Sequence, residues 1–461
     1  MSSTPVPRGI ALLGLASSMF LVVLDAAMTN LAGPDIREGL GLSAAELTLV
    51  ASSYLVPLAG LLLLGGRLAD VVGGRRIYVA GMAVYLVATA FCALAVNGPM
   101  LIAGRIGQGI GGAIVIPSAL ALALAISTTP AARTRTVGIW GATSGAGGLL
   151  GFLLGGVLTQ AFGWTAVFWA PVPIGLLSMA LVLRSVPAVS GRPGRIDVPG
   201  AITITGGISA IAYGVVSASE SRWSEPGSFI AIAAGLAFLA AFVAVELRAA
   251  NPLVPLEVFR RGPVIRASVV VMALGGVFGS MFFLLPQYLQ QVVGLEARSA
   301  GLAQAPLPLM IIVGSALAPV VARAIGLARA CTAGLFLLLA GFAWLIFNPA
   351  DDRYSVHLAG AFVLLGAGVG IGLVNAIAIA VRDATEGESG LLSGLVSAAQ
   401  QVGAAAGVAI LGGIAIGAGG ELNFTTAFVS QAVLVLIAFG LSLIHGARTE
   451  RTEAVAYLER V

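Results

Sequence analysis

Residues 66–81 read GRLADVVGGRRIYVAG, a short turn with one aspartate and three arginines that joins two apolar segments. Residues 319–334 read PVVARAIGLARACTAG and can be laid over the first stretch. The matched pairs, each 253 residues apart, are Gly73 with Gly326, Arg76 with Arg329, and Gly81 with Gly334. The match indicates that the turn and its two flanking segments occur twice in the chain.

A second set of glycines repeats with nearly the same offset. The pairs, 256 residues apart, are Gly138 with Gly394, Gly147 with Gly403, Gly151 with Gly407, and Gly156 with Gly412. Two alignments in the same order predict two copies of one six-helix unit. Parallel repeats related by an axis along the membrane normal usually enclose a binding site near the bilayer midplane.

The composition places both copies in a membrane. Of the 461 residues 58% are hydrophobic and 10% charged, whereas soluble domains carry about a quarter charged residues. A span needs roughly 20 apolar residues to cross a hydrocarbon layer of ~30 Å. Fourteen such runs begin near Ile10, Leu47, Ile77, Leu101, Val137, Thr165, Pro199, Ser228, Val264, Leu302, Ala330, Val356, Leu395 and Ala427. We therefore predict an all-α integral membrane protein with 14 transmembrane helices.

The repeat also predicts the domain boundaries. Residues 1–185 would form a first six-helix bundle and residues 264–446 a second one. Residues 186–263 would supply two inserted helices with their flanking loops, and residues 447–461 a cytoplasmic tail. The sequence gives no reason for the insertion.

The arginines predict the orientation, because cytoplasmic loops carry excess positive charge. The chain has no lysine, and nineteen of its 24 arginines fall on one side if the N-terminus is cytoplasmic. The opposite loops hold Arg37, Arg222, Arg298 and Arg353, and Arg105 falls inside the fourth span. We expect a bacterial inner-membrane protein with both termini in the cytoplasm.

Several classes of protein are disfavoured by what the sequence lacks. Without lysine there is no Walker A motif and no Schiff-base residue, and no loop could hold a nucleotide-binding domain. The arginines are dispersed, the glycines from Gly366 to Gly372 follow no strand, and the two cysteines have no metal-ligand spacing. We expect no enzyme, no cofactor, no metal, and neither nucleotide nor nucleic acid as partner.

Two charged residues within apolar spans are the candidates for a mechanism. Asp25 lies in LDAAMTNLAGPDI of the first span, where a carboxylate costs about 2.5–3.5 kcal/mol on insertion scales. Arg105 and Gln108 lie at i and i+3 on one face of the fourth span. These residues either carry protons or fix helix packing, and their spacing alone leaves both roles open.

Other segments suggest packing and gating. Gly147, Gly151 and Gly155 form a four-residue stripe in the fifth span, which predicts a close helix contact. Asp70, with Arg75 and Arg76, lies in a turn predicted to be cytoplasmic, where a charge pair could form in one conformation and break in another. That turn is a candidate latch of an inner gate.

Together these segments resemble the major facilitator superfamily, and specifically its fourteen-helix drug:proton antiporters of the EmrB/QacA type. GRLADVVGG is similar to the loop motif GxLADRxGRR, LDAAMTNLAGPDI to LDxTIVNVALPxI, and AGRIGQGIGGAIVIP to the motif of helix 4. The resemblance implies that Asp25 is the acidic position of helix 1, Arg105 the proton-transfer arginine, and Asp70 with Arg75 the latch charges. It covers nearly the whole chain.

The chain departs from that family pattern at three places. Val71 and Gly74 stand where the loop motif has arginines, Phe152 replaces the proline of the antiporter motif GPxxGG, and after Trp164 the usual arginine and asparagine appear as Thr165 and Pro171. The loss of the proline keeps a symporter or a dedicated metabolite exporter open as the alternative to drug antiport.

The expected function is proton-driven export of a hydrophobic or amphipathic small molecule by alternating access. Protons, the lipid bilayer and a lipophilic or cationic substrate would be the partners. Candidate contacts in the substrate cavity are polar residues on inward faces: Asn30, Tyr54, Gln108, Gln287, Gln291, Asn375 and Gln401. Each could equally be a hydrogen-bonding residue between helices.

Overall fold

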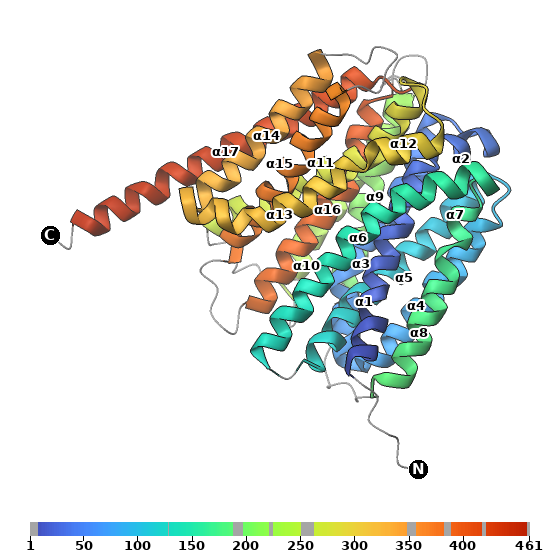
Figure 1. Ribbon diagram of the computed structural model, residues 1–461, viewed down its shortest axis with the longest axis horizontal. Helices are drawn as coiled ribbons and strands as arrows, with labels where there is room; N and C mark the ends of the chain where they lie inside the picture. The colour runs from blue at the N-terminus through green and yellow to red at the C-terminus, as the bar shows by residue number, and fades with distance from the viewer. Residues whose placement is uncertain are drawn as a thin grey trace.

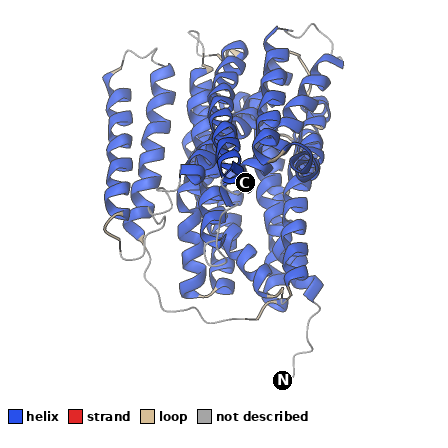
Figure 2. Ribbon diagram, turned by 90° about the vertical axis from the view of Figure 1, so that its left-hand side faces the viewer, coloured by secondary structure: helices blue, strands red, loops and turns tan. Residues whose placement is uncertain are grey.

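The computed structural model describes residues 8–127, 129–187, 197–220, 225–249, 262–347, 356–381, 389–416 and 421–458. Within these ranges it contains helices and no named strand (Figures 1 and 2). Fourteen helical stretches are long and apolar enough to cross a membrane, and all begin close to their predicted starts. The predicted all-α membrane architecture is therefore confirmed.

Eight helices form the first bundle, which we call the N-half. They are α1 (Arg8–Leu31), α2 (Gly33–Leu40), α3 (Ala44–Val72), α4 (Gly74–Ala93), α5 (Gly98–Ala125), α6 (Pro130–Phe162), α7 (Ala166–Trp169) and α8 (Pro171–Ser185). The short α2 lies outside the spans, and α7 and α8 together make one span. We call the end of the molecule that carries α2 the α2 end, and the opposite end, where α1 begins, the Arg8 end.

Seven helices form the second bundle, which we call the C-half. They are α11 (Gly262–Gln291), α12 (Ala297–Gln304), α13 (Pro306–Ile325), α14 (Leu327–Phe347), α15 (Val356–Val381), α16 (Ser389–Ile414) and α17 (Phe424–Leu458). Figure 1 shows the last turns of α17 projecting beyond the bundle, so the helix runs through most of the segment predicted as a tail. Between the halves in sequence lie α9 (Val198–Glu220) and α10 (Pro226–Glu246).

Polar residues begin the helices at the α2 end, because an apolar segment in lipid must satisfy its backbone groups internally or at a cap. Ser43 accepts a hydrogen bond from the Glu46 amide at 3.1 Å, and the Glu46 carboxylate accepts one from the Ser43 amide at 2.8 Å. Asn97 caps α5 by accepting from the Met100 amide at 2.9 Å. These side chains fix where α3 and α5 start.

The matched turns have the same backbone conformation in both halves. Gly73, before α4, has φ of 110°, and Gly326, before α14, has φ of 87°. Both values lie in the region that residues with a Cβ rarely adopt. The two glycines that the sequence alignment paired therefore allow the same backbone turn in each half.

The repeated glycines form matching seams between helices. A Cβ on Gly147 or Gly151 of α6 would lie 2.7 Å from the Phe20 carbonyl or 2.6 Å from Ala27 of α1. In the C-half, Gly407 of α16 lies as tightly against Gly276 of α11. Small residues allow such backbone approach between membrane helices.

The inserted helix α9 packs against both halves. Thr205 of α9 lies so close to Gly60 of α3 that a Cβ on that glycine would collide with its hydroxyl. Ile208 shares an apolar cluster with Val56 of α3 and Ala405 of α16. One side of the seam between the halves is thus covered by α9, and α10 packs on α9.

Hydrogen bonds join the halves at the α2 end. Gln290 of α11 donates to the Leu31 carbonyl at 2.8 Å. Arg37 and Glu421 form a two-pronged ion pair, with Nη2 to Oε1 at 2.7 Å and Nη1 to Oε2 at 2.8 Å. Gln160 of α6 donates to Glu296 before α12 at 2.5 Å. These contacts hold the two halves together at this end.

Phe152, which stands at the position of the motif proline, is part of the same closure. Its side chain is fully buried, and its ring centroid lies 5.2 Å from that of Phe282 in α11. A Cβ on Gly301 of α12 would collide with the Phe152 carbonyl. The N-half therefore inserts an aromatic side chain into the C-half at this position.

Candidate functional site

The charged centre of the protein lies inside the N-half, where three helices meet. Asp25 of α1 is fully buried, and Arg105 of α5 is 1% exposed. The Arg105 Nη1 donates to the Asp25 Oδ2 at 3.2 Å. The two intramembrane charges singled out in the sequence are thus brought into one ion pair.

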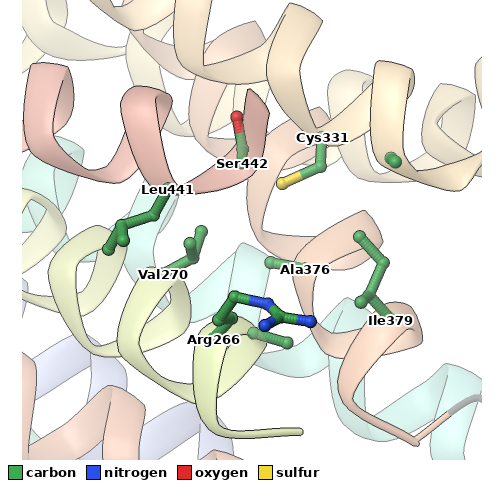
Figure 3. Close-up of a pocket in the computed structure, with 9 residues that line it drawn as sticks. Arg266, Val270, Cys331, Ala376, Ile379, Leu441 and Ser442 are labelled. Atoms are coloured by element: carbon green, nitrogen blue, oxygen red, sulfur yellow. The ribbon is translucent and has the colours of Figure 1, made fainter. Parts of the chain in front are cut away.

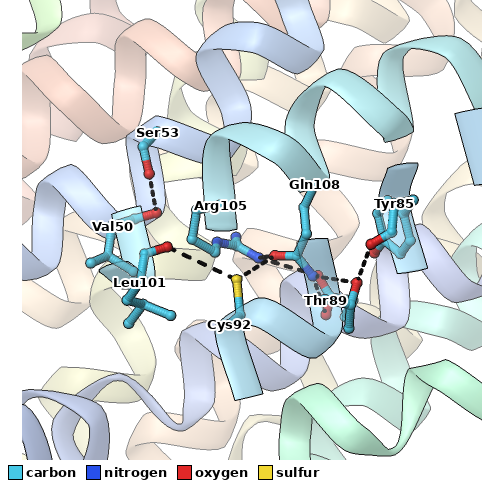
Figure 4. Close-up of polar contacts among 9 residues, drawn as sticks. Val50, Ser53, Tyr85, Thr89, Cys92, Leu101, Arg105 and Gln108 are labelled. Atoms are coloured by element: carbon cyan, nitrogen blue, oxygen red, sulfur yellow. Dashed lines mark hydrogen bonds and ion pairs between the residues drawn. The ribbon is translucent and has the colours of Figure 1, made fainter. Parts of the chain in front are cut away.

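Gln108 is bonded through both ends of its amide. Its Nε2 donates to Asp25 Oδ1 at 3.2 Å and to the Thr89 hydroxyl at 2.9 Å, while its Oε1 accepts from Arg105 Nη1 at 2.9 Å. The Cys92 thiol also points to Oε1 at 3.6 Å (Figure 4). If the Gln108 amide were flipped, its NH2 group would face the Arg105 Nη1, which is also a donor. The network therefore fixes the orientation of the Gln108 amide.

Arg105 has a further partner that is not an anion. Its guanidinium carbon lies 4.3 Å from the ring centroid of Tyr54 in α3. The face of an aromatic ring attracts a cation within about 6 Å. The Arg105 Nε is buried without a hydrogen-bond partner among the described residues. The positive charge is therefore held by Asp25, Gln108 and Tyr54.

Glycines of α5 allow the neighbouring helices to approach this centre. A Cβ on Gly109 would lie 2.4 Å from the Tyr54 carbonyl of α3, and one on Gly111 would lie 2.6 Å from the Tyr85 amide of α4. These close contacts bring Tyr54 and Tyr85 against the helix that carries Arg105. The glycine-rich sequence of the fourth span thus positions the site.

The sequence reasoning missed the contribution of α4. Thr89 and Cys92 both contact Gln108, and Thr89 also donates to the Tyr85 carbonyl at 2.7 Å. Tyr85 lies close to Asp25, although its hydroxyl has no hydrogen bond of normal geometry to any residue that the structure describes. The spacing of these three residues, four and then three, places them on one helical face, which is the signal that could have revealed them.

The candidate latch residues lie in and beside the turn between α3 and α4. The Asp70 side chain falls outside the part of the chain that the structure describes. Arg75 donates to the Leu183 carbonyl of α8 at 2.5 Å, within the N-half, and Arg76 is exposed.

The third glycine of the stripe, Gly155, lies against Met28 of α1.

The candidate cavity residues are distributed over both halves. Gln287 and Asn375 are buried and donate to the backbone four residues earlier, to Phe283 at 3.0 Å and Ile371 at 2.9 Å. Asn30 and Gln401 are half-buried, and Gln291 is exposed at the last position of α11. Within the described ranges, no hydrogen bond joins two of these five side chains. Their role as contacts in a substrate cavity stays a prediction.

Two further buried amides of the C-half escaped the sequence reasoning. Gln304 of α12 is fully buried, and neither its Oε1 nor its Nε2 has a hydrogen-bond partner among the described residues. Gln431 of α17 donates to the Ser280 hydroxyl at 2.9 Å, while its Oε1 has no partner in the same part of the chain. Among the described residues no group of three or more His, Cys, Asp or Glu could hold a metal ion.

Comparison with protein families gives a match over most of the chain. The model of the Major Facilitator Superfamily matches residues 15–408. The cephamycin export protein of Amycolatopsis lactamdurans is 35% identical over 92% of this chain and 90% of its own length. The puromycin resistance protein of Streptomyces alboniger is 35% identical over 89% of this chain and 82% of its own length. A methylenomycin A resistance protein of Streptomyces coelicolor is 30% identical over 98% of this chain and 95% of its own length.

Solved structures with the same fold are more distant in sequence. The POT family transporter PepTSo superposes with a TM-score of 0.71 at 17% identity, over 98% of this chain and 99% of that one. The second structure is a bacterial homologue of the human lysosomal transporter Spinster, in an inward-facing and unoccupied conformation. It superposes with a TM-score of 0.67 at 17% identity, over 96% of this chain and 97% of that one. These similarities support the fold alone.

Proposed function

Because the chain belongs to the Major Facilitator Superfamily, whose members are multi-pass membrane transporters, we propose that it exports a lipophilic small molecule in exchange for protons that bind Asp25. The observation that carries this proposal is the buried group of Asp25, Arg105 and Gln108. Ionisable residues at membrane depth are costly, and those that occur commonly mark ion or proton paths.

The proposal places the Arg8 end in the cytoplasm, in agreement with the distribution of arginines. The hydrogen bonds and ion pair between the halves then lie at the outer end. A conformation joined there would receive its substrate from the cytoplasm, and parting of these contacts would release it outside. Rocking of one repeat against the other is the usual motion of such folds.

Asp25 can take up a proton because Arg105, its partner in the ion pair, has further partners of its own. Removing one partner from a buried ion pair generally costs about 3–5 kcal/mol. When Asp25 takes up a proton, however, Arg105 keeps the Gln108 oxygen at 2.9 Å and the Tyr54 ring at 4.3 Å. The remaining contacts lower the cost of neutralising the carboxylate. In this conformation Asp25 is buried, so it must be exposed by a conformational change before it exchanges a proton with solvent.

The membrane potential supplies enough free energy to drive efflux. Moving one elementary charge through 100 mV supplies about 2.3 kcal/mol. By the rule of tenfold per 1.4 kcal/mol, one coupled charge supports roughly fiftyfold accumulation.

The class of substrate follows from the scarcity of other buried charges. Apart from Asp25 and Arg105, the fully buried polar side chains within the described ranges are mainly hydroxyls and amides, with Glu246 of α10 as a further acid. An interior with so few charges suits a neutral or singly cationic amphipathic molecule. Three relatives are named for antibiotics, which supports an antibiotic-like secondary metabolite as the cargo.

The test is transport by purified protein in liposomes with an imposed pH gradient. A lipophilic cationic dye should accumulate with wild type, and a protonophore or Asp25→Asn should abolish accumulation. Asp35→Asn is the matched control, because Asp35 lies on α2 outside the spans and should leave transport unchanged. Gradient-driven transport by Asp25→Asn at the wild-type rate would refute the role of Asp25.

A dedicated exporter or a symporter is the second candidate function. Phe152, in place of the motif proline, favours it, because the residue packs between the halves instead of bending α6. A panel of dyes and antibiotics separates the candidates. Transport of one metabolite only would indicate a dedicated exporter, and proton flux in the same direction as the substrate would indicate a symporter.

A further inference from the structure

Two buried tyrosines of α4 differ in the bonding of their hydroxyl groups. The Tyr78 hydroxyl shares hydrogen bonds with the hydroxyls of Ser18 at 2.8 Å and Ser178 at 2.7 Å. The Tyr85 hydroxyl is fully buried close to Asp25 and has no hydrogen bond of normal geometry to a described residue. Buried polar groups are normally paired. Tyr85 therefore has an unused hydrogen-bonding group beside the charged centre.

The repeat shows that packing at the position of Tyr85 needs no hydroxyl. The offset of 253 residues places Leu338 of α14 at this position, and Leu338 is fully buried in the core of the C-half. A Cβ on Gly111 of α5 would lie 2.6 Å from the Tyr85 amide. In the same way, a Cβ on Gly368 of α15 would lie 2.8 Å from the Leu338 amide. A leucine packs there as closely as the tyrosine does, so helix packing does not explain the Tyr85 hydroxyl.

Tyr78, by contrast, fills space and joins helices. Its repeat position in the C-half is Cys331, which borders a small cavity together with Ser442 (Figure 3). In the N-half the larger phenol is fully buried, and its hydroxyl joins α1 to α8 through Ser18 and Ser178. Tyr78 is thus a packing residue on the same helix, against which the role of Tyr85 can be compared.

Protonation of Asp25 creates a need that its present partners do not meet. Arg105 Nη1 and Gln108 Nε2 each donate to the carboxylate at 3.2 Å. A protonated carboxyl carries an O–H group, which needs an acceptor. Gln108 Oε1 already accepts from Arg105 at 2.9 Å, and the Thr89 hydroxyl already accepts from Gln108 at 2.9 Å (Figure 4). The Tyr85 hydroxyl oxygen, close to Asp25, is an acceptor without a donor among the described residues.

The other charged and titratable groups at this centre are engaged differently. Tyr54 of α3 turns the face of its ring toward Arg105, and Cys92 of α4 points to Gln108. Apart from these groups, the helices packed on α1 and α4 carry charged or titratable residues only near the two ends of the molecule, within the described ranges. Tyr85 is therefore the group best placed to respond to the proton of Asp25.

We propose that the Tyr85 hydroxyl accepts a hydrogen bond from protonated Asp25 and thereby stabilises its neutral form, a positioning role that rests on the proton coupling proposed above. The proton bonds to an Asp25 oxygen and stays there, so Tyr85 neither gains nor loses a proton. Arg105 meanwhile keeps its contacts with Gln108 and Tyr54. The hydroxyl thus completes the set of partners that allows the carboxylate to be neutralised inside the protein.

The comparison of the halves supports this pairing of acid and hydroxyl. The C-half has Phe278 at the repeat position of Asp25 and Leu338 at that of Tyr85. The acid and the tyrosine are therefore present together in one half and absent together from the other.

The test is a pH titration of the purified full chain, without substrate, followed by infrared spectroscopy. The carboxylic-acid C=O band that wild type shows and Asp25→Asn lacks reports protonated Asp25. Tyr85→Phe should move the midpoint of this band about one pH unit lower, because the neutral form loses one hydrogen bond. Tyr85→Leu, which introduces the residue of the C-half, should give the same shift. Tyr78→Phe is the matched control, because it removes a buried hydroxyl from the same helix and should leave the midpoint unchanged.

The outcomes distinguish this inference from the proposed function. If wild type shows no Asp25 band at any pH at which it is folded, proton binding at Asp25 is refuted and the role of Tyr85 with it. If the band is present but Tyr85→Phe keeps the wild-type midpoint, the role of Tyr85 alone is overturned. A shift in Tyr54→Phe in place of Tyr85→Phe would also overturn it, because the acceptor would then be Tyr54.

Discussion

The two halves share their packing and differ in their polar interior. Each has a left-handed glycine before its third span and a glycine seam between its first and fifth spans. Yet the repeat position of Asp25 in the C-half is Phe278, whose ring lies 4.3 Å from that of Phe282. The N-half therefore holds an ion pair where the C-half holds stacked aromatic rings.

The hydrogen bonding of buried amides differs in the same way. Gln108 in the N-half has partners at both its oxygen and its nitrogen. In the C-half, Gln287, Gln304 and Gln431 each have at least one buried atom without a partner among the described residues. Buried polar groups are normally paired, so these atoms are the ones expected to meet water or a ligand. The comparison shows that two copies of a repeat can keep the same helix packing while only one of them carries the buried ion pair.

The largest expected effect comes from making the N-half resemble the C-half. Asp25→Leu alone should destabilise the protein by about 3–5 kcal/mol, because Arg105 is left as a buried cation without its anion. The double variant Asp25→Leu with Arg105→Met should recover most of that stability, since apolar residues can replace a buried ion pair at little cost. Proton-coupled transport should remain absent in both.

Thermal unfolding of the purified variants in one detergent measures this effect, and Asp35→Asn again serves as a control. If the double variant is as unstable as Asp25→Leu, the ion pair is needed for folding itself. That outcome would contradict the view that the N-half carries its charges for function.

The amides provide a smaller test of the same comparison. Gln108→Met should cost about 1–3 kcal/mol, because the Asp25 Oδ1 loses its hydrogen-bond donor and Arg105 loses one of its acceptors. Gln304→Met should be neutral or stabilising, because it removes an amide whose two polar atoms are buried without partners in the described part of the chain. Thermal unfolding of the two variants side by side checks the prediction. A larger loss for Gln304→Met would show that its amide has a partner, such as bound water.

Much of the fold and the two charges of the site could be predicted from the sequence. Fourteen apolar runs give the spans by length alone, and Arg105 with Gln108 was expected to share one helical face, as the bond of 2.9 Å between them confirms. Asp25 could be recognised because a carboxylate in an apolar span is costly. These features depend on local composition and helical spacing.

Features that depend on contacts between distant helices could not be predicted. The cation–aromatic contact of Tyr54 with Arg105 joins α3 to α5, and Thr89 reaches Gln108 from α4. The position of α9 across α3 and α16 likewise depends on tertiary packing, which no periodicity in the sequence encodes. The insertion of Phe152 into the C-half was visible in the sequence only as a departure from a motif.

The smallest expected effect is the pH dependence of the link between the halves at the α2 end. The hydrogen bond from Arg37 lowers the pKa of Glu421 below its ordinary value of 4.5. The ion pair therefore contributes fully above that value and is lost as the pH falls through the lowered pKa. Because Glu421 is largely exposed, solvent and salt screen the pair and the effect is small.

Spin labels on Glu38 and Thr425, in a background without the two native cysteines, report this link. The distance distribution should stay constant at neutral and mildly acidic pH and broaden only below the ordinary carboxyl range. Glu421→Gln should show the broader distribution at every pH. A change centred near neutral pH would mean that another group controls the contact.

Proton release on substrate binding tests the central claim most directly, namely that Asp25 is the site at which proton and substrate compete. Purified protein in weakly buffered detergent solution is mixed with a transported substrate, and the pH is followed with an indicator dye. We predict that wild type releases protons and that Asp25→Asn binds substrate without releasing any. Equal proton release by wild type and Asp25→Asn would contradict the account, because the proton would then come from another group.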